Sequence, residues 1–164
     1  MFLAGAILGL VTLQRLGELV LSRRNTERML ARGAHEVAPG HYPLIVALHA
    51  AWLAGLWYFA VWRADVEVSV VWLVVFVVLQ GLRAWVIATL GPRWTTRIIV
   101  LPGAPLVRAG PYRFVSHPNY CVVAAEILVL PLCFGLVWYG IVFSGLNALV
   151  LWIRIRAEQA ALRQ

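Results

Sequence analysis

The sequence predicts an all-α integral membrane protein with five transmembrane helices. Its 164 residues are 62% hydrophobic and 13% charged, and the mean hydropathy is +0.83. A chain of this length has no soluble core that could bury so many apolar side chains, whereas apolar runs of about 20 residues are typical of membrane helices. No internal repeat divides the chain, so we expect a single domain over residues 1–164. The predicted spans are residues 2–21, 42–62, 70–90, 118–133 and 137–155.

The first span contains polar residues in its second half, namely Gln14, Arg15 and Glu18. An ionisable side chain inside a bilayer costs about 2.5 to 3.5 kcal/mol on insertion scales, so such residues usually pair or face a cavity. Arg15 and Glu18 are three residues apart and can pair along the helix. Two interpretations stay open: a self-satisfied ion pair, or two side chains that project into a cofactor or acceptor cavity.

Residues 22–41 are rich in arginine, which is typical of a cytoplasmic loop, and a short amphipathic surface helix is expected within them. In the second span, His49 has no metal-type residue at i+3 or i+4, so we interpret it as an interior histidine rather than a ligand. In the third span, Arg83 has no acidic partner on its own helix. Glu18 of the first span is the candidate partner.

The loop over residues 91–116 is the longest, and its centre, residues 98–107, has the pattern of two short extended pieces around a glycine turn. We expect this hairpin to lie over the cytosolic membrane face and to close a binding site there. The last two spans are short for a full crossing, so they are expected to form a helical hairpin.

A polar segment from Val107 to Tyr120 precedes the fourth span. Gly110-Pro111 breaks the preceding structure, and Pro118 suits the first turn of a helix capped by Ser116 or His117. The N-terminus of such a helix attracts a carboxylate or a phosphate. Ordinary loop punctuation with topology-setting arginines is the alternative explanation.

Polar residues also align on the last two helices. Asn119 and Glu126 share one face by spacing, as do Asn147, Arg154 and Glu158 on the final helix. Residues aligned in this way would line a cavity or form an interhelical hydrogen-bond seam.

The distribution of arginine predicts a multi-pass protein with its N-terminus outside and its C-terminus in the cytoplasm. All fourteen basic residues are arginine, which suggests a GC-rich genome and a bacterial inner membrane. The formal net charge of +7 suits contact with anionic membrane lipids. Nothing beyond charge points to nucleic acid, and no pattern predicts a metal site.

Two segments, Gly110-Pro111-Tyr112-Arg113-Phe114 and His117-Pro118-Asn119-Tyr120, resemble the signature of the isoprenylcysteine carboxyl methyltransferase family. The resemblance extends upstream over residues 90–95 and downstream over residues 154–158. It implies that S-adenosylmethionine is the cofactor and that Glu158 contacts it, while Arg154 meets the acceptor. The other cofactor-binding residues that it implies are Ala104, Pro105, Leu106, Val107, Tyr112, His117, Pro118, Asn119 and Tyr120.

The sequence departs from the family pattern at two positions. Ser116 stands where the family commonly has arginine before the histidine, and Glu158-Gln159 stands where a pair of glutamates is common. Cofactor binding remains expected, and the acceptor's identity is open.

The expected activity is S-adenosylmethionine-dependent O-methylation of a lipophilic acceptor, either a small molecule or a lipidated one, that enters from the bilayer. The family reaction is carboxyl methylation, in which Arg154 would hold a carboxylate that is already ionised at neutral pH. A phenol or enol acceptor would need a base, for which His117 or Glu126 is available. Two alternatives stay open: an NADPH-dependent membrane reductase of the sterol-reductase type, and a non-enzymatic scaffold or permease.

Overall fold

The computed structural model describes residues 2–62 and 66–161 and is mostly helical within them. The α-helices are α1 (Phe2–Leu30), α2 (Tyr42–Trp62), α3 (Val70–Leu90), α4 (Pro118–Cys133) and α5 (Val137–Ala161). Three 3-10 helices, η1 (Pro39–His41), η2 (Gly91–Arg93) and η3 (Gly110–Arg113), lie in the loops. The two short strands are β1 (His35–Glu36) and β2 (Ile99–Val100).

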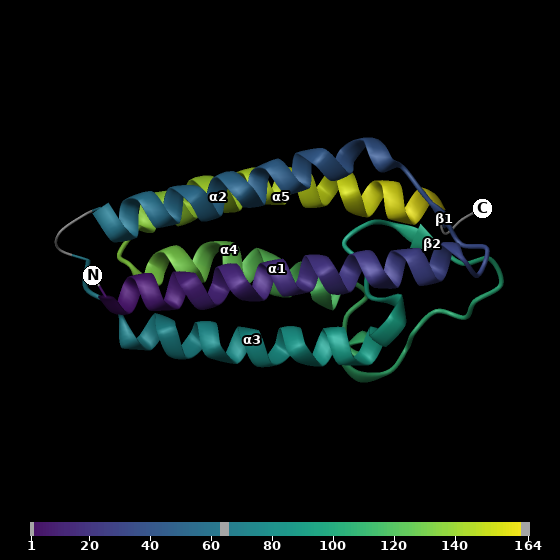
Figure 1. Cartoon of the computed structure of the whole chain (residues 1–164), viewed down its shortest axis with the longest axis horizontal. Coiled ribbons are helices and arrows are strands. Elements are labelled where there is room, and N and C mark those ends of the chain that lie inside the picture. The colour runs from purple at the N-terminus through teal and green to yellow at the C-terminus, as the bar shows by residue number, and fades with distance from the viewer. Residues whose placement is uncertain (1, 63–65, 162–164) are drawn as a thin grey trace.

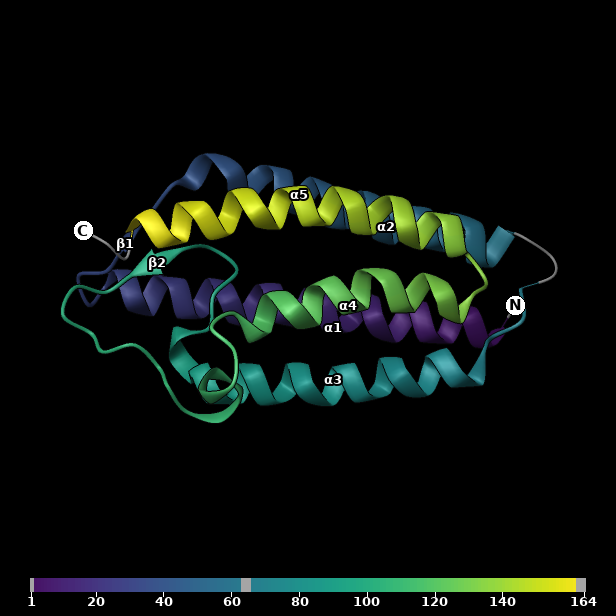
Figure 2. The ribbon, with the colours of Figure 1, turned by 180° about the vertical axis from the view of Figure 1, so that it is seen from behind.

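The α-helices run along one common axis (Figures 1 and 2). In both views α1 and α4 lie between the pair α2 and α5 on one side and α3 on the other. Both strands and residues 91–117 gather at one end of the bundle, which we call the loop end. The described N-terminal residues lie at the opposite end.

The prediction of an all-α membrane protein is confirmed. Helices α1, α2, α3 and α5 are long and apolar enough to cross a membrane. Helix α4 has 16 residues, which is about 24 Å at helical rise, against a hydrocarbon core of about 30 Å. The structure therefore supports four candidate spans, and the arrangement of five spans stays a prediction.

Helix α1 is longer than the sequence predicted, because it continues to Leu30 instead of ending near residue 21. The expected amphipathic surface helix is thus the last part of α1. No glycine or proline lies between Leu21 and Leu30 to stop the helix. It ends where Gly33 adopts a φ of +87° and the N–H of Ala34 bonds to the carbonyl of Met29 at 3.1 Å, the pattern of a Schellman cap.

The prediction that the two halves of residues 98–107 pair with each other is wrong, although the turn between them is present. The glycine turn exists, because Gly103 has a φ of +73° and the N–H of Ala104 bonds to the carbonyl of Leu101 at 3.2 Å. Strand β2, however, pairs antiparallel with β1 from the loop after α1, with His35 opposite Val100. An ion pair of 2.8 Å between Arg97 and Glu36 supports this pairing.

A cluster of charged side chains links α1, α3 and α4 inside the bundle. Arg83 lies between Glu18 and Glu126, with its Nη1 3.0 Å from the Glu126 carboxylate, and the predicted Glu18 partner is confirmed. Arg15 lies 2.9 Å from Glu18 and 3.0 Å from Glu126. The predicted pair of Arg15 and Glu18 therefore exists within a larger interhelical network. We call Arg15, Glu18, Arg83 and Glu126 the buried ionic cluster.

Neutral side chains complete this network. The Gln80 amide donates to Glu126 at 2.8 Å and accepts from Gln14 at 2.8 Å. His49, as expected for an interior histidine, has its Nδ1 2.9 Å from the carbonyl of Ile45. The charged and amide groups of this network thus find protein partners, as burial in an apolar environment requires.

Candidate functional site

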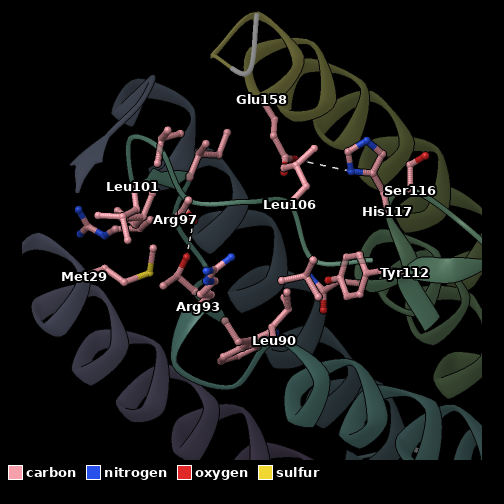
Figure 3. Close-up of a pocket in the computed structure, with 18 of the residues that line it drawn as sticks. Met29, Leu90, Arg93, Arg97, Leu101, Leu106, Tyr112, Ser116, His117 and Glu158 are labelled. Atoms are coloured by element: carbon pink, nitrogen blue, oxygen red, sulfur yellow. Dashed lines mark hydrogen bonds and ion pairs between the residues drawn. The ribbon is translucent and has the colours of Figure 1, made fainter. Parts of the chain in front are cut away.

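A cavity of about 520 Å³ opens at the loop end of the bundle. Its walls come from the end of α1, the segments before and after β2, the start of α4 and the end of α5. Figure 3 shows Met29 and Leu101 on one side of this cavity and Ser116 and His117 on the other. Ligand sites commonly occupy about 300 to 1,000 Å³, so the volume suits a nucleotide-sized molecule.

The structure brings together nearly all the residues that the resemblance implied. Those that line the cavity are Ala104, Pro105, Leu106, Val107, Tyr112, His117, Asn119, Tyr120, Arg154 and Glu158. Pro118 does not line it. This proline is buried in the first turn of α4, so it starts the helix on which its neighbours are displayed.

One hydroxyl joins the polar groups of α4 and α5. The Tyr120 hydroxyl accepts a hydrogen bond from Arg154 Nε at 2.8 Å and donates one to Glu158 Oε2 at 2.6 Å. Arg154 and Glu158 are four residues apart and so occupy one face of α5. The phenol therefore fixes the position of a cation and an anion on the cavity wall.

His117 adds an imidazole to this group. Its Nδ1 lies 3.8 Å from Glu158 Oε2, and the two side chains approach each other in Figure 3. The ring stacks on Tyr120, with centroids 5.3 Å apart and planes 15° apart. His117, Tyr120, Arg154 and Glu158 thus form one connected group, which we call the cavity tetrad.

The N-cap of α4 is His117, one of the two predicted cap residues, and its side chain makes no capping hydrogen bond. Asn119 and Tyr120, in the first turn, line the cavity. The positive end of the α4 dipole therefore lies beside the cavity, where it favours a carboxylate.

Tyr112 enters the cavity from η3. Burial, together with the nearby negative charge of Glu158, raises the pKa of its phenol to about 12. The hydroxyl therefore keeps its proton at neutral pH, and Tyr112 can donate a hydrogen bond to a ligand but cannot act as a base there.

The loop wall is tied to the end of α3. Arg93 Nη1 donates to the carbonyl of Pro105 at 2.7 Å, which holds residues 104–107 against η2. Neither Arg93 nor Trp94 was predicted to have a role in the site. The signal that could have found them is their place in residues 90–95, which carried the resemblance without an assigned function.

Two polar atoms of the cavity lining have no protein partner. Trp94 Nε1 and Asn119 Oδ1 are buried, and neither makes a hydrogen bond within the described residues. Trp94 as a whole is 2% exposed. A buried donor or acceptor without a partner is costly, so these atoms fit a site that a polar ligand completes.

Two other residues that aligned with the site in sequence do not reach it. Glu126 lies in the buried ionic cluster, bound by two arginines, and Asn147 is buried in the bundle with its Oδ1 unpaired among the described residues. Neither lines the cavity. Helical spacing predicted which face of the helix they occupy, but not that they lie too far along the helix axis to reach the cavity.

A family model, that of the isoprenylcysteine carboxyl methyltransferase (ICMT) family, matches residues 72–164. The chain belongs to this family. The matched region includes α4, α5 and every residue of the cavity tetrad, so the ICMT signature and the cavity coincide. Helices α1 and α2 precede it.

Two bacterial relatives resemble the chain over most of its length. YpbQ of Bacillus subtilis (strain 168), described as uncharacterized, is 36% identical over 161 residues, covering 96% of this chain and 95% of YpbQ. An uncharacterized protein of Haemophilus influenzae (strain ATCC 51907 / DSM 11121 / KW20 / Rd) is 24% identical over 155 residues, covering 90% and 88%. No solved structure matches the chain.

The donor set of this ICMT cavity fits a nucleotide-type cofactor better than a metal. It offers one carboxylate, four guanidinium groups, one imidazole, two unpaired polar atoms and the positive end of a helix. Within residues 2–62 and 66–161, no three His, Cys, Asp or Glu side chains gather as a metal site would require. The ionic groups are fixed before any ligand arrives, which reduces the entropy lost on binding.

Proposed function

We propose that this protein is a membrane O-methyltransferase that uses S-adenosylmethionine and methylates a lipophilic acceptor. The observation that carries the proposal is the cavity tetrad. A carboxylate, a guanidinium and an imidazole, joined by one phenol, face a nucleotide-sized cavity in the half of the chain that matches the ICMT family.

The cofactor would be held by a negative group and a positive group on the cavity wall. The Glu158 carboxylate suits a cationic group or a hydroxyl of the ligand, and the start of α4 suits a carboxylate. Trp94 Nε1 and Asn119 Oδ1 would gain the partners that they lack. When bound, S-adenosylmethionine supplies an electrophilic methyl group on a sulfonium.

Arg154 is the group proposed to receive the acceptor. Its Nε is engaged by Tyr120, which leaves the two Nη groups of the guanidinium for an incoming carboxylate. A carboxylate is already ionised at neutral pH, so its methylation requires orientation and no proton transfer. This chemistry favours a carboxylic acid as the acceptor.

A phenol or enol acceptor would need a base, and the geometry favours one of the two candidates. His117 lines the cavity, whereas Glu126 is held by Arg15 and Arg83 outside it. His117 is therefore the proposed base for an acceptor of that class.

The proposed acceptor is lipophilic, either a small molecule or a lipidated one, because much of the wall is apolar. Leu90, Ile98, Leu101 and Val107 line the cavity, and Leu106 is on its rim with 64% of its surface exposed. An alkyl chain contacting these residues could extend toward the bilayer.

The proposed location is the inner membrane of a bacterium, with the cavity facing the cytoplasm and the N-terminus outside. Within the part of the chain that the structure describes, the exposed loop arginines Arg93, Arg97, Arg108 and Arg113 lie at the loop end. An excess of arginine is typical of the cytoplasmic side, where S-adenosylmethionine is made.

The experiment is a transfer assay with methyl-tritiated S-adenosylmethionine. Purified protein in nanodiscs is mixed with long-chain fatty acids and with lipid extracts, and label is counted in the organic phase. We expect transfer by the native protein and its loss in Arg154→Gln. The matched control is Arg156→Gln, whose guanidinium lies 4.3 Å from the Trp152 ring rather than in the cavity. Oxidation of NADPH without methyl transfer would instead favour a reductase.

A further inference from the structure

Residues 106–115 contain exposed apolar side chains next to arginines whose side chains have no partner among the described residues. Phe114 is 77% exposed, Leu106 64% and Val115 45%. Arg108 and Arg113 are exposed as well, and within the described residues neither side chain makes a hydrogen bond or an ion pair. We call residues 106–115 the lip segment, because it forms the outer edge of the cavity.

The lip segment packs beside a membrane helix. Gly110 has a φ of +53° and lies so close to α3 that a Cβ there would be 3.2 Å from Trp85 Nε1 and would collide with the Thr89 side chain. Figures 1 and 2 show the chain swinging outward after β2 and returning beside the loop end of α3.

The outer face of α3 leads toward this contact. Leu82 is 40% exposed and Trp85 45% exposed on a helix that is long and apolar enough to span a membrane. The exposed apolar side chains of the lip segment therefore extend the lipid-facing surface of α3 to the membrane boundary. At that boundary aromatic rings lie at the headgroup level and arginines reach lipid phosphates.

We propose that the lip segment docks on the anionic phospholipid surface of the membrane, and that this contact stabilises the cavity wall. Arg108 and Arg113 would contact lipid phosphates, while Phe114 and Val115 enter the upper part of the acyl region. Basic residues next to inserted aromatic and aliphatic side chains are the pattern of an interfacial membrane anchor.

The coupling to the cavity follows from the residues that the lip segment shares with the cavity wall. Leu106, Val107, Arg108 and Tyr112 line the cavity, and Phe114 follows η3 directly. A lipid surface that holds the outer side restricts the freedom of the inner side, so cofactor binding loses less conformational entropy. This second part rests on the proposed function, whereas the docking itself does not.

The docking is tested with a fluorescent label in nanodiscs. An environment-sensitive dye is attached to Val115→Cys in a Cys121→Ser background, because Cys121 is exposed and would also react. The discs contain phosphatidylcholine alone or with one third phosphatidylglycerol, and nitroxide lipids serve as quenchers. The matched control carries the dye at Pro102→Cys, an exposed site in the glycine turn of the same loop.

We expect nitroxide quenching at position 115 and none at position 102, with a further blue shift at 115 when phosphatidylglycerol is present. Arg113→Gln should remove that lipid-dependent shift and Arg113→Lys should restore it, since charge is the cause. Equal quenching at the two positions, or emission that ignores anionic lipid, would overturn the docking.

The coupling is tested by the affinity for S-adenosylhomocysteine in the two disc types. Phosphatidylglycerol should strengthen binding by up to about fivefold for each arginine that contacts it, and Arg113→Gln should reduce that gain. Equal affinity in both discs would overturn the coupling. Absence of binding in both, with the label still quenched, would instead contradict the proposed function and leave the docking supported.

Discussion

Arg83 of α3 donates two hydrogen bonds to Glu18 of α1, from Nε to Oε1 at 2.6 Å and from Nη2 to Oε2 at 2.5 Å. The same guanidinium donates to Glu126 of α4, so three helices meet at one side chain. Two arginines and two glutamates make the buried ionic cluster neutral as a whole. Its pairing is complete, so we interpret it as the link between the signature-bearing helix α4 and the N-terminal helix α1.

Removing one member of this cluster should strongly destabilise the bundle. In Glu18→Gln, Arg83 loses its two-point partner while it remains buried, and breaking a buried pair costs about 3 to 5 kcal/mol. Thermal unfolding in detergent measures the loss. Glu27→Gln is the control, because Glu27 forms an exposed pair with Arg23 at 3.1 Å, and such pairs contribute about 0.5 kcal/mol or less. Similar shifts for the two variants would contradict the structural role of the cluster.

Tyr120→Phe should weaken cofactor binding without unfolding the protein. The substitution removes the hydroxyl that fixes Arg154 and Glu158, and hydrogen bonds to charged groups contribute about 1.5 to 3 kcal/mol, which is roughly 10- to 150-fold in affinity. Isothermal calorimetry with S-adenosylhomocysteine measures the effect. Tyr139→Phe is the control, because its hydroxyl donates to Trp52 inside the bundle at 2.7 Å, away from the cavity. Unchanged affinity in Tyr120→Phe would show that the phenol has no such role.

Trp94→Phe should weaken ligand binding without lowering thermal stability. The indole N–H is buried without a partner, so its removal should leave thermal stability unchanged or raise it slightly. If a ligand atom accepts that hydrogen, affinity for S-adenosylhomocysteine should fall about fivefold or more. A variant that binds as tightly as the native protein would mean that the N–H faces no ligand.

The Tyr112 phenol should lose its proton only at a pH far above that of the binding and transfer assays. Because its pKa is raised to about 12 by burial and by Glu158, the folded state holds its proton more strongly than the unfolded state, whose tyrosine pKa is near 10. Its contribution to stability is thus present below pH 10 and is lost as the pH rises toward 12. Tyrosinate absorbance at 295 nm, compared between native protein and Tyr112→Phe, should differ only above about pH 11. A difference at pH 10 would contradict this environment.

Local patterns predicted the parts of the site that lie close together in sequence. The proline start of α4, the glycine turn at Gly103 and the shared face of Arg154 and Glu158 all follow from backbone preference or helical spacing. The pairing of Arg83 with Glu18 was also predictable, because a buried arginine needs an anion and few were available.

Tertiary pairing was harder to predict. Strand β2 could have folded back on its own loop, and only the approach of β1, more than sixty residues earlier in the chain, decides its partner. Likewise the spacing of Glu126 and Asn119 gave one helix face but not the depth at which Arg15 and Arg83 enclose the carboxylate.

Cofactor choice tests the central claim most directly. Isothermal calorimetry on the purified protein should detect one S-adenosylhomocysteine per chain, a loss of at least tenfold in affinity in Glu158→Gln, and no binding of NADPH. Binding of NADPH with none of the adenosyl ligand, or full affinity in Glu158→Gln, would contradict the assignment of this cavity to S-adenosylmethionine.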